Sequence, residues 1–172
     1  MQCLILGGAR SGKSRYAEQL ASSTGKTVVY IATATAQDAE MQARIAHHQA
    51  SRPADWRTVE EPLHLAACLA QYASADTVLV VDCLTLWLTH LLCHADTTLL
   101  ERETQQLLAT LPQLAGDIVC VSNEVGLGIV PLGELTRRYV DEAGRLHQQL
   151  AVQCTQVVFM VAGLPHVLKN NA

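Results

Sequence analysis

The sequence lacks the features that are typical of nucleic-acid-binding and membrane proteins. Its formal net charge is −4, and its longest basic run is Arg137-Arg138. A nucleic-acid-binding surface is normally strongly basic, so we expect no nucleic-acid partner. The longest apolar stretch, Val78–Cys93, contains Asp82. This stretch is better explained as a buried strand that leads into a helix, so we also expect no transmembrane segment.

Paired cysteines and a secretion signal are missing too. The six cysteines form no C-x-x-C pair, and no signal peptide precedes the first glycine-rich motif, which begins close to Met1. A disulfide framework normally belongs to a short secreted chain. We therefore expect most of the cysteines to be small buried hydrophobic residues in a reducing compartment, and the predicted location is cytoplasmic.

What the sequence does contain is typical of a compact α/β domain. Hydrophobic residues make up 49% and charged residues 16% of the 172 residues, a balance that favours a globular chain over a disordered one. Buried strands are predicted at Cys3–Leu6, Thr27–Ala32, Thr77–Asp82, Ile118–Ser122 and Val157–Ala162, the last of the chain. Helices are predicted before Gly25 and at Asp38–Ser51, Pro62–Tyr72, Leu84–His94, Leu99–Leu111 and Leu132–Val152, with Trp56–Glu61 as a linking or edge segment. This alternation predicts one domain, residues 1–172, with a parallel sheet covered on both faces.

A phosphate-binding motif follows the first strand. Gly7-Gly8-Ala9-Arg10-Ser11-Gly12-Lys13-Ser14 matches G-x-x-x-x-G-K-[ST], which is specific when a strand precedes it and a helix follows. The glycines let backbone amides approach phosphate oxygens, and the helix directs its positive end toward the same anion. Lys13 supplies a cation for the β and γ phosphates, and the Ser14 hydroxyl is a candidate Mg²⁺ ligand. The alternative is a glycine turn with an incidental lysine, which the flanking elements disfavour. The motif predicts a P-loop NTPase fold, with three layers around a mostly parallel central sheet.

Asp82 is the candidate for a second group at the metal. It ends the strand Val78–Val81, where P-loop proteins have a Walker-B carboxylate directed toward Mg²⁺. An aspartate at this position could instead cap the helix Leu84–His94. The four apolar residues before the aspartate favour the metal or nucleotide role.

Two adjacent histidines, His47 and His48, are candidates for the chemistry. With about 100° of helical turn per residue, His48 lies roughly 20° from Met41 on the apolar stripe, and His47 lies roughly 240° around the helix. The wheel therefore favours His48, whose neutral imidazole would be a competent nucleophile toward phosphorus. The alternative for one inward histidine is a hydrogen-bonded core residue.

The remaining histidines carry weaker signals. His90 and His94 have the i, i+4 spacing of a metal pair, but no glutamate follows His90 and no third ligand is evident. We predict that both are ordinary helix residues. Three others are isolated in the sequence, namely His64, His147 and His166.

Two further residue types have open interpretations. Trp56 and Trp87 are predicted to be packing residues rather than platforms for a stacked ligand. Glu60-Glu61 could bind a ribose hydroxyl, but an exposed acidic turn explains the pair equally well.

Several segments together resemble one known family. They are the P-loop with Arg15, Tyr30-Ile31-Ala32-Thr33, Glu40-Met41-x-x-Arg44-Ile45-x-His47-His48, Arg52-Pro53-x-x-Trp56-Arg57-Thr58 and Ser122-Asn123-Glu124-Val125-Gly126. These segments look like those of the bifunctional adenosylcobinamide kinase/adenosylcobinamide-phosphate guanylyltransferase of cobalamin synthesis. The resemblance runs from Cys3 to about Lys169. The paired histidines with R-P-x-x-W-R-T, and N-E-V-G, are more discriminating than the P-loop.

The resemblance implies two reactions. A nucleoside triphosphate, ATP or GTP, first phosphorylates the aminopropanol hydroxyl of adenosylcobinamide. A histidine then attacks the α-phosphate of GTP, releases pyrophosphate and carries GMP to adenosylcobinamide phosphate, which gives adenosylcobinamide-GDP. By similarity and by the helical wheel, that nucleophile is assigned to His48, with His47 as the alternative. The family is also known as a homotrimer.

The resemblance also implies a set of guanine-nucleotide contacts. They fall on Gly7–Ser14, Thr33, Ala34, Thr35, Gln49, Ala50, Ser51, Arg52, Glu60 and Asp82. Ala34 stands where a small polar residue is expected, and Asp82 stands where many relatives have glutamate. Asn123–Gly128 follows the carboxyl end of a strand, where α/β proteins bind ligands, so this segment is a candidate border of the corrinoid site.

Two other functions stay open on the sequence alone. A small-molecule kinase would use the P-loop without a guanylyl step, and α-labelled GTP would then leave no label on the protein. A GTP-dependent switch would normally carry the guanine-reading motif N-K-x-D, which is absent, and Ser122-Asn123-Glu124-Val125 does not replace it.

Overall fold

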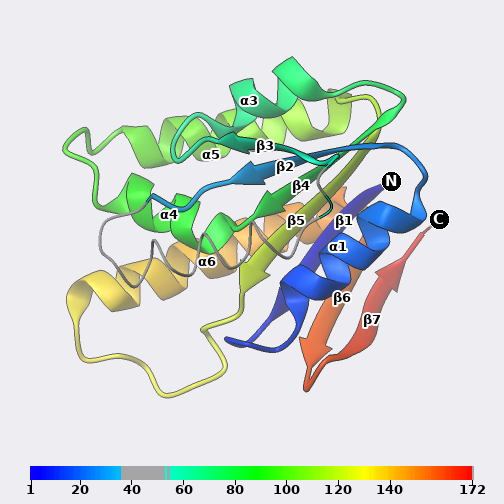
Figure 1. Ribbon diagram of the computed structural model, residues 1–172. Coiled ribbons are helices and arrows are strands. Elements are labelled where there is room, and N and C mark those ends of the chain that lie inside the picture. Colours follow the sequence, from blue (N-terminus) through cyan, green and yellow to red (C-terminus); the bar gives the residue numbers. More distant parts are fainter. Residues whose placement is uncertain (36–52, 54, 172) are drawn as a thin grey trace.

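The computed structural model describes residues 1–35, 53 and 55–171, which form a seven-stranded sheet flanked by helices (Figure 1). The strands are β1 (Gln2–Gly7), β2 (Thr27–Ala32), β3 (Arg57–Glu60), β4 (Thr77–Asp82), β5 (Asp117–Asn123), β6 (Gln156–Val161) and β7 (Leu164–Asn170). The helices are α1 (Lys13–Ser23), α3 (Leu65–Tyr72), α4 (Leu84–Leu92), α5 (Leu99–Thr110) and α6 (Glu134–Gln153), with a 3-10 turn at Leu111–Gln113. The helix predicted at Asp38–Ser51 lies outside the described residues. Among the described helices, none is long and apolar enough to cross a membrane.

The sheet is parallel except at one edge. Its order is β3-β2-β4-β5-β1-β6-β7, and every neighbouring pair runs parallel apart from β6 and β7. Central strands of a parallel sheet are buried on both faces, which explains the unbroken apolar runs of β1 and β4. The predicted mostly parallel sheet is therefore confirmed, and within the predicted linking or edge segment Trp56–Glu61 the residues Arg57–Glu60 form the edge strand β3.

Helices cover both faces of the sheet and complete three layers (Figure 1). Because side chains alternate along a strand, β4 contributes to both cores. Val78 and Val80 pack in the cluster that includes α1, whereas Leu79 and Val81 pack in the cluster that includes α3, α4, α5 and α6. The three-layer arrangement that the P-loop motif predicts is therefore present.

The antiparallel edge strand β7 was not predicted. The last strand predicted from the sequence ends at Ala162, whereas β6 ends at Val161 and the chain then reverses through Ala162 and Gly163. Both turn residues have positive φ, 51° and 82°, which suits a tight two-residue hairpin. Most of β7 is exposed, so it lacks the buried apolar run from which the five buried strands are predicted.

The cysteines largely occupy the predicted environment. Four of them are buried, Cys83 is half-buried and Cys93 is exposed, and all six are free thiols. Burial raises the pKa of the Cys3 thiol to about 12. The buried cysteines therefore serve as small hydrophobic residues rather than as reactive thiolates.

Candidate active site

The loop between β1 and α1 needs glycine at two positions. Gly7 has φ 149°, and a Cβ added there would lie 2.5 Å from the carbonyl oxygen of Met160. Gly12 has φ 94°, and its added Cβ would lie 3.2 Å from the Cα of Gly163. The Gly163 N–H also donates to the carbonyl oxygen of Ser11 at 3.0 Å. Close packing, of Gly7 against β6 and of Gly12 against the β6–β7 turn, therefore accounts for the two glycines.

Lys13 begins α1, and its ammonium group lies within the loop. Its Nζ donates to the carbonyl oxygen of Gly8 at 2.7 Å, and the residue is only 7% exposed. Burial lowers the pKa of Lys13, and the negative charge of Asp82 opposes this shift. Gly12, the N-cap residue of α1, provides no side-chain cap. A buried cation and the positive end of a helix therefore meet in one loop, which suits an anion.

A buried serine hydroxyl in the same loop has no partner. The Ser11 Oγ is shielded from solvent and makes no hydrogen bond with any of the described residues. Buried polar atoms are normally satisfied, so an orphaned hydroxyl indicates a group that the chain itself does not supply. A phosphate oxygen would satisfy it.

Asp82 ends β4 beside this loop. Its Oδ2 accepts a hydrogen bond from the Tyr30 hydroxyl at 2.6 Å. Its charge is near enough to Lys13 to raise the pKa of that ammonium. Cys83, not Asp82, is the N-cap residue of α4, and it makes no side-chain cap. The alternative that Asp82 caps the helix is therefore wrong, because its carboxylate bonds across to β2.

Thr33, directly after β2, joins the ends of β2 and β4. It is fully buried, its hydroxyl donates to the Cys83 carbonyl oxygen at 2.7 Å, and it accepts from the Cys83 N–H at 2.9 Å. The Thr33 carbonyl oxygen lies 3.1 Å from Nε2 of His90. His90 is thus a helix residue as predicted, and its ring helps to hold the end of β2 next to Asp82.

The segment after β5 lies against the P-loop. The Glu124 N–H donates to the Gly7 carbonyl oxygen at 3.0 Å, and the Asn123 N–H donates to Thr85 Oγ1 at 2.7 Å. Behind it, Nε2 of His147 lies 2.8 Å from the Ser122 Oγ, and its Nδ1 lies 3.6 Å from a Glu124 carboxylate oxygen. His147, isolated in the sequence, is therefore part of a buried polar cluster. Burial lowers its pKa, and Glu124 opposes this shift.

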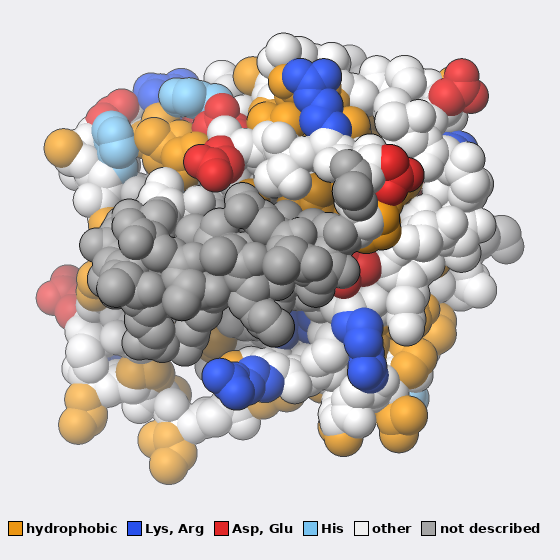
Figure 2. Space-filling model, in the orientation of Figure 1, with side chains coloured by type: hydrophobic (Ala, Val, Ile, Leu, Met, Phe, Trp, Pro, Cys, Tyr) orange, Lys and Arg blue, Asp and Glu red, His pale blue; other side chains and the backbone are white. Residues whose placement is uncertain are grey.

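An aliphatic loop continues from this segment into α6. Leu127, Ile129 and Leu132 are 80%, 97% and 98% exposed. Figure 2 shows hydrophobic side chains that protrude at the lower left, where Figure 1 has the loop that leads into α6. The loop and α6 enclose a hollow of about 270 Å³ lined by Val125, Gly126, Gly128, Ile129, Val130, Pro131, Arg137, Val140 and Asp141. Exposed apolar surface beside a binding loop is typical of a surface that a ligand or another chain covers.

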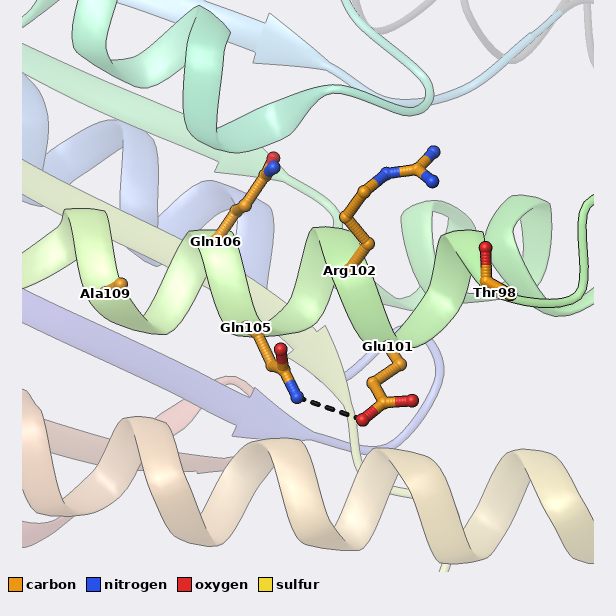
Figure 3. Close-up of a pocket in the computed structure, with 6 residues that line it drawn as sticks. All are labelled: Thr98, Glu101, Arg102, Gln105, Gln106 and Ala109. Atoms are coloured by element: carbon orange, nitrogen blue, oxygen red, sulfur yellow. Dashed lines mark hydrogen bonds between the residues drawn. The ribbon is translucent and has the colours of Figure 1, made fainter.

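A larger hollow, of about 470 Å³, lies on the outer face of α5 (Figure 3). Its lining comes from successive turns of that helix and its N-terminus: Thr98, Glu101, Arg102, Gln105, Gln106 and Ala109. The Gln105 side chain donates to Glu101 at 3.0 Å. None of these residues belongs to the P-loop or to a strand end, so this hollow is not the active site.

The chain matches a family model and individual relatives over nearly its whole length. Residues 3–168 match the family described as cobinamide kinase / cobinamide phosphate guanyltransferase. The chain is 62% identical over 171 residues to the bifunctional adenosylcobalamin biosynthesis protein CobP of Pseudomonas aeruginosa, covering 99% of each. It is 40% identical over 177 residues to the bifunctional adenosylcobalamin biosynthesis protein CobU of Escherichia coli, covering 95% of this chain and 97% of that protein. The chain belongs to this family.

Membership confirms the resemblance stated above and the enzyme class that it implied, a bifunctional kinase and guanyltransferase of cobalamin biosynthesis. Solved structures agree on the fold alone. The RadB recombinase matches with a TM-score of 0.53 at 16% identity, over 92% of this chain and 73% of that one. The P4 protein of bacteriophage phi6 in complex with ADP matches with a TM-score of 0.50 at 12% identity, over 96% of this chain and 53% of that one.

Most of the candidate nucleotide- and metal-binding residues that the structure describes lie at one edge of the sheet. The P-loop, Thr33–Thr35, Glu60 and Asp82 all stand at or just after the carboxyl ends of β1, β2, β3 and β4. Glu61, by contrast, accepts hydrogen bonds from the backbone of Leu63 and His64, so it shapes a turn. His47, His48 and Gln49–Arg52 lie outside the described residues.

Sequence reasoning missed three contributors to this edge. Tyr30 bonds Asp82, His147 supports Ser122 and Glu124, and Gly163 packs on the P-loop. Each acts across a large separation in sequence. Only the Ala162-Gly163 dipeptide carried a local signal, since glycine at a two-residue turn is typical of a hairpin. His64 is isolated in the sequence, and in the fold its Nδ1 lies 3.0 Å from a carboxylate oxygen of buried Glu103.

Proposed function

We propose that this enzyme phosphorylates the aminopropanol hydroxyl of adenosylcobinamide with ATP or GTP, and then transfers GMP from GTP to the product. The second reaction gives adenosylcobinamide-GDP and pyrophosphate through a GMP–histidine intermediate. The observation that carries the proposal is the family match across residues 3–168, on a chain whose P-loop, Lys13 and Asp82 meet at one sheet edge.

The P-loop residues Gly7–Ser14 would bind the outer phosphates. Lys13 would leave the Gly8 carbonyl and donate to a phosphate oxygen, and the orphaned Ser11 hydroxyl would gain a partner. Transfer of a phosphoryl group mainly requires positioning and neutralisation of charge. The buried ammonium and the N-terminus of α1 supply both.

Ser14 and Asp82 are proposed to hold Mg²⁺. A hydroxyl and a carboxylate are hard oxygen donors, and Mg²⁺ in nucleotide sites normally takes one or two such ligands besides water and phosphate. When bound, the ion would neutralise charge on the phosphates.

The remaining nucleotide contacts are proposed by family resemblance. They are Thr33, Ala34, Thr35, Gln49, Ala50, Ser51, Arg52 and Glu60. Exposed Glu60, at the end of β3, is suited to a ribose hydroxyl, whereas Glu61 is engaged in its turn. The Thr33 hydroxyl is already bonded to Cys83, and its N–H and carbonyl oxygen are engaged by Asp82 and His90, so a contact there would use the second lone pair of the hydroxyl oxygen.

His48 is the proposed nucleophile toward the α-phosphate, with His47 as the alternative. Covalent capture by an imidazole divides nucleotidyl transfer into two displacements, each with its own leaving group. Incubation with α-labelled GTP should leave an acid-labile, alkali-stable label on the protein. His48→Ala should lose the label and His47→Ala should keep it. The reverse result would move the assignment to His47, and an unlabelled wild-type protein would reduce the function to a kinase.

The segment Asn123–Gly128 is proposed to border the corrinoid site. Its contact with Gly7 and the exposed aliphatic loop beyond it support this assignment. Asn123→Ala or Glu124→Ala should raise the KM for adenosylcobinamide or lower turnover, and two variants with unchanged kinetics would contradict the assignment. Four expectations from the sequence remain predictions: the homotrimer, the single domain 1–172, the cytoplasmic location and the absence of a nucleic-acid partner.

A further inference from the structure

Tyr30 reaches the end of β4 from the middle of β2. In the parallel register it lies opposite Val80, and Asp82 is two residues further along β4 on the same face. Diagonal neighbours at this spacing are within reach only of long side chains. The Tyr30 ring spans the gap, and its hydroxyl donates to Asp82 Oδ2 at 2.6 Å. A phenylalanine would fill the same space without that bond.

The Tyr30 ring is packed in place. Tyr30 is 2% exposed and belongs to the core cluster that includes α1. Half-buried Trp56 packs against the same cluster and stacks on the Tyr30 ring, with ring centroids 6.5 Å apart and planes 29° apart. Trp56 directly precedes β3. Its backbone N–H donates to the Pro53 carbonyl oxygen at 3.1 Å, which helps to fix its position. A ring packed in this way cannot easily leave its hydrogen-bonded position.

The Asp82 backbone is also held in place. Its carbonyl oxygen accepts from the Thr33 N–H at 3.3 Å, and the neighbouring Cys83 is bonded in both directions to the Thr33 hydroxyl. Rotation of the carboxylate about its own side-chain bonds is therefore the main freedom left to Asp82. The Tyr30 hydroxyl engages one oxygen and limits that rotation.

We propose that Tyr30 is a positioning residue, which holds the Asp82 carboxylate in the orientation that receives the nucleotide-bound metal, and that Trp56 keeps Tyr30 in place. The inference rests on the metal role of Asp82 given under the proposed function. A carboxylate oriented in advance binds a cation more tightly, because less rotational freedom is lost on binding. In this role Tyr30 acts on the metal only through Asp82.

Direct metal binding tests this role without relying on turnover. Mn²⁺ would be titrated with electron paramagnetic resonance into the full-length protein bound to a nonhydrolysable GTP analogue. Tyr30→Phe should weaken Mn²⁺ binding about 10-fold, the size expected for loss of one hydrogen bond to a charged group. Trp56→Leu should weaken it about threefold, and Trp56→Phe should restore most of the loss, since an aromatic ring can stack again.

A matched control is Tyr72→Phe. The Tyr72 hydroxyl likewise makes a side-chain hydrogen bond, which it accepts from Arg57 at 3.2 Å, but Tyr72 ends α3 and packs in the core on the other face of the sheet from Tyr30. This variant loses one phenolic hydroxyl away from the nucleotide edge, so its Mn²⁺ affinity should match the wild type. Equal weakening in both tyrosine variants would overturn the proposal.

Two further measurements separate positioning from other causes. The affinity for the GTP analogue in EDTA should be unchanged in Tyr30→Phe, and an equal loss there would show a general structural effect and overturn the inference. Asp82→Asn should weaken Mn²⁺ binding more than Tyr30→Phe does. If Asp82→Asn weakens Mn²⁺ binding and Tyr30→Phe does not, the positioning role of Tyr30 is wrong and the metal role of Asp82 stands. If Asp82→Asn has no effect, the metal role of Asp82 fails with it.

Discussion

Charged residues at the two ends of the sheet are used in opposite ways. At the amino end, the Asp117 carboxylate binds both the Met1 ammonium group and Lys26, whose Nζ lies at 2.8 Å. At the carboxyl end, Lys13 donates to a backbone carbonyl and Asp82 accepts from a tyrosine, and the described residues show no ion pair between them. Charged groups that are paired within the chain stabilise the fold, whereas charged groups that lie close together without forming an ion pair remain available to bind a ligand.

The largest effect is expected at the carboxyl end. Lys13→Ala should reduce the rate of adenosylcobinamide phosphorylation by about 1,000-fold, because a preorganised cation at the phosphates is lost. The free energy of unfolding should not fall, since an incompletely paired buried ammonium is costly to hold. Kinase assays and urea denaturation would measure the two quantities. Lys26→Ala is the control, and it should lower stability while turnover remains; similar losses of activity in both variants would break the comparison.

At the amino end, Asp117→Asn should lower the free energy of unfolding by about 2 kcal/mol and leave turnover intact. Burial alone would raise the pKa of Asp117, but bonds and charges from Lys26 and the terminal amine lower it overall. A lowered folded-state pKa stabilises the protein above about pH 4, and this contribution is lost as the pH falls through the folded value. Urea denaturation would be compared at about pH 7 and about pH 3. The wild type should lose this contribution to the free energy of unfolding at the lower pH, and the Asp117→Asn variant should not.

His147 sharpens the comparison, since it is buried behind the active edge. Burial lowers its pKa, so the unfolded chain binds the proton more readily than the folded one. Stability should therefore be complete above the ordinary value of about 6.5 and should fall as the pH drops below it toward the lowered folded-state pKa. His147→Gln should remove this pH dependence. A wild-type protein that gains stability on acidification through that range would contradict the burial argument.

The smallest effect is expected for a pair at neither end. Arg145 donates to Glu142 at 2.7 Å one turn away on α6, and the Arg145 side chain is 63% exposed. Solvent screens such a pair, so Arg145→Ala should change the free energy of unfolding by less than about 0.5 kcal/mol. A loss comparable to that of Asp117→Asn would mean that location in the fold does not decide the value of an ion pair.

Much of this edge could be predicted because its residues are neighbours in sequence. Gly7–Ser14 and Asp82 were recognised from a strand that ends in glycine and a strand that ends in a carboxylate, patterns that local backbone geometry requires. β4 has the predicted bounds, Thr77–Asp82. The family followed from short motifs spread over the chain, and the comparisons confirmed it.

The partners of those residues could not be predicted, because they meet only when the sheet assembles. Hydrophobic periodicity assigns a residue to a face, but it does not say which strand will lie beside it. The hydrogen bond between Tyr30 and Asp82 joins residues 52 positions apart, and the one between His147 and Ser122 joins residues 25 positions apart. Both depend on the strand order β2-β4-β5 and on the helices that pack against these strands. The local sequence thus determines which chemical groups the P-loop contains. The orientation of these groups and the contacts that support them depend on long-range packing, because hydrogen-bond geometry is set by the relative positions of whole strands.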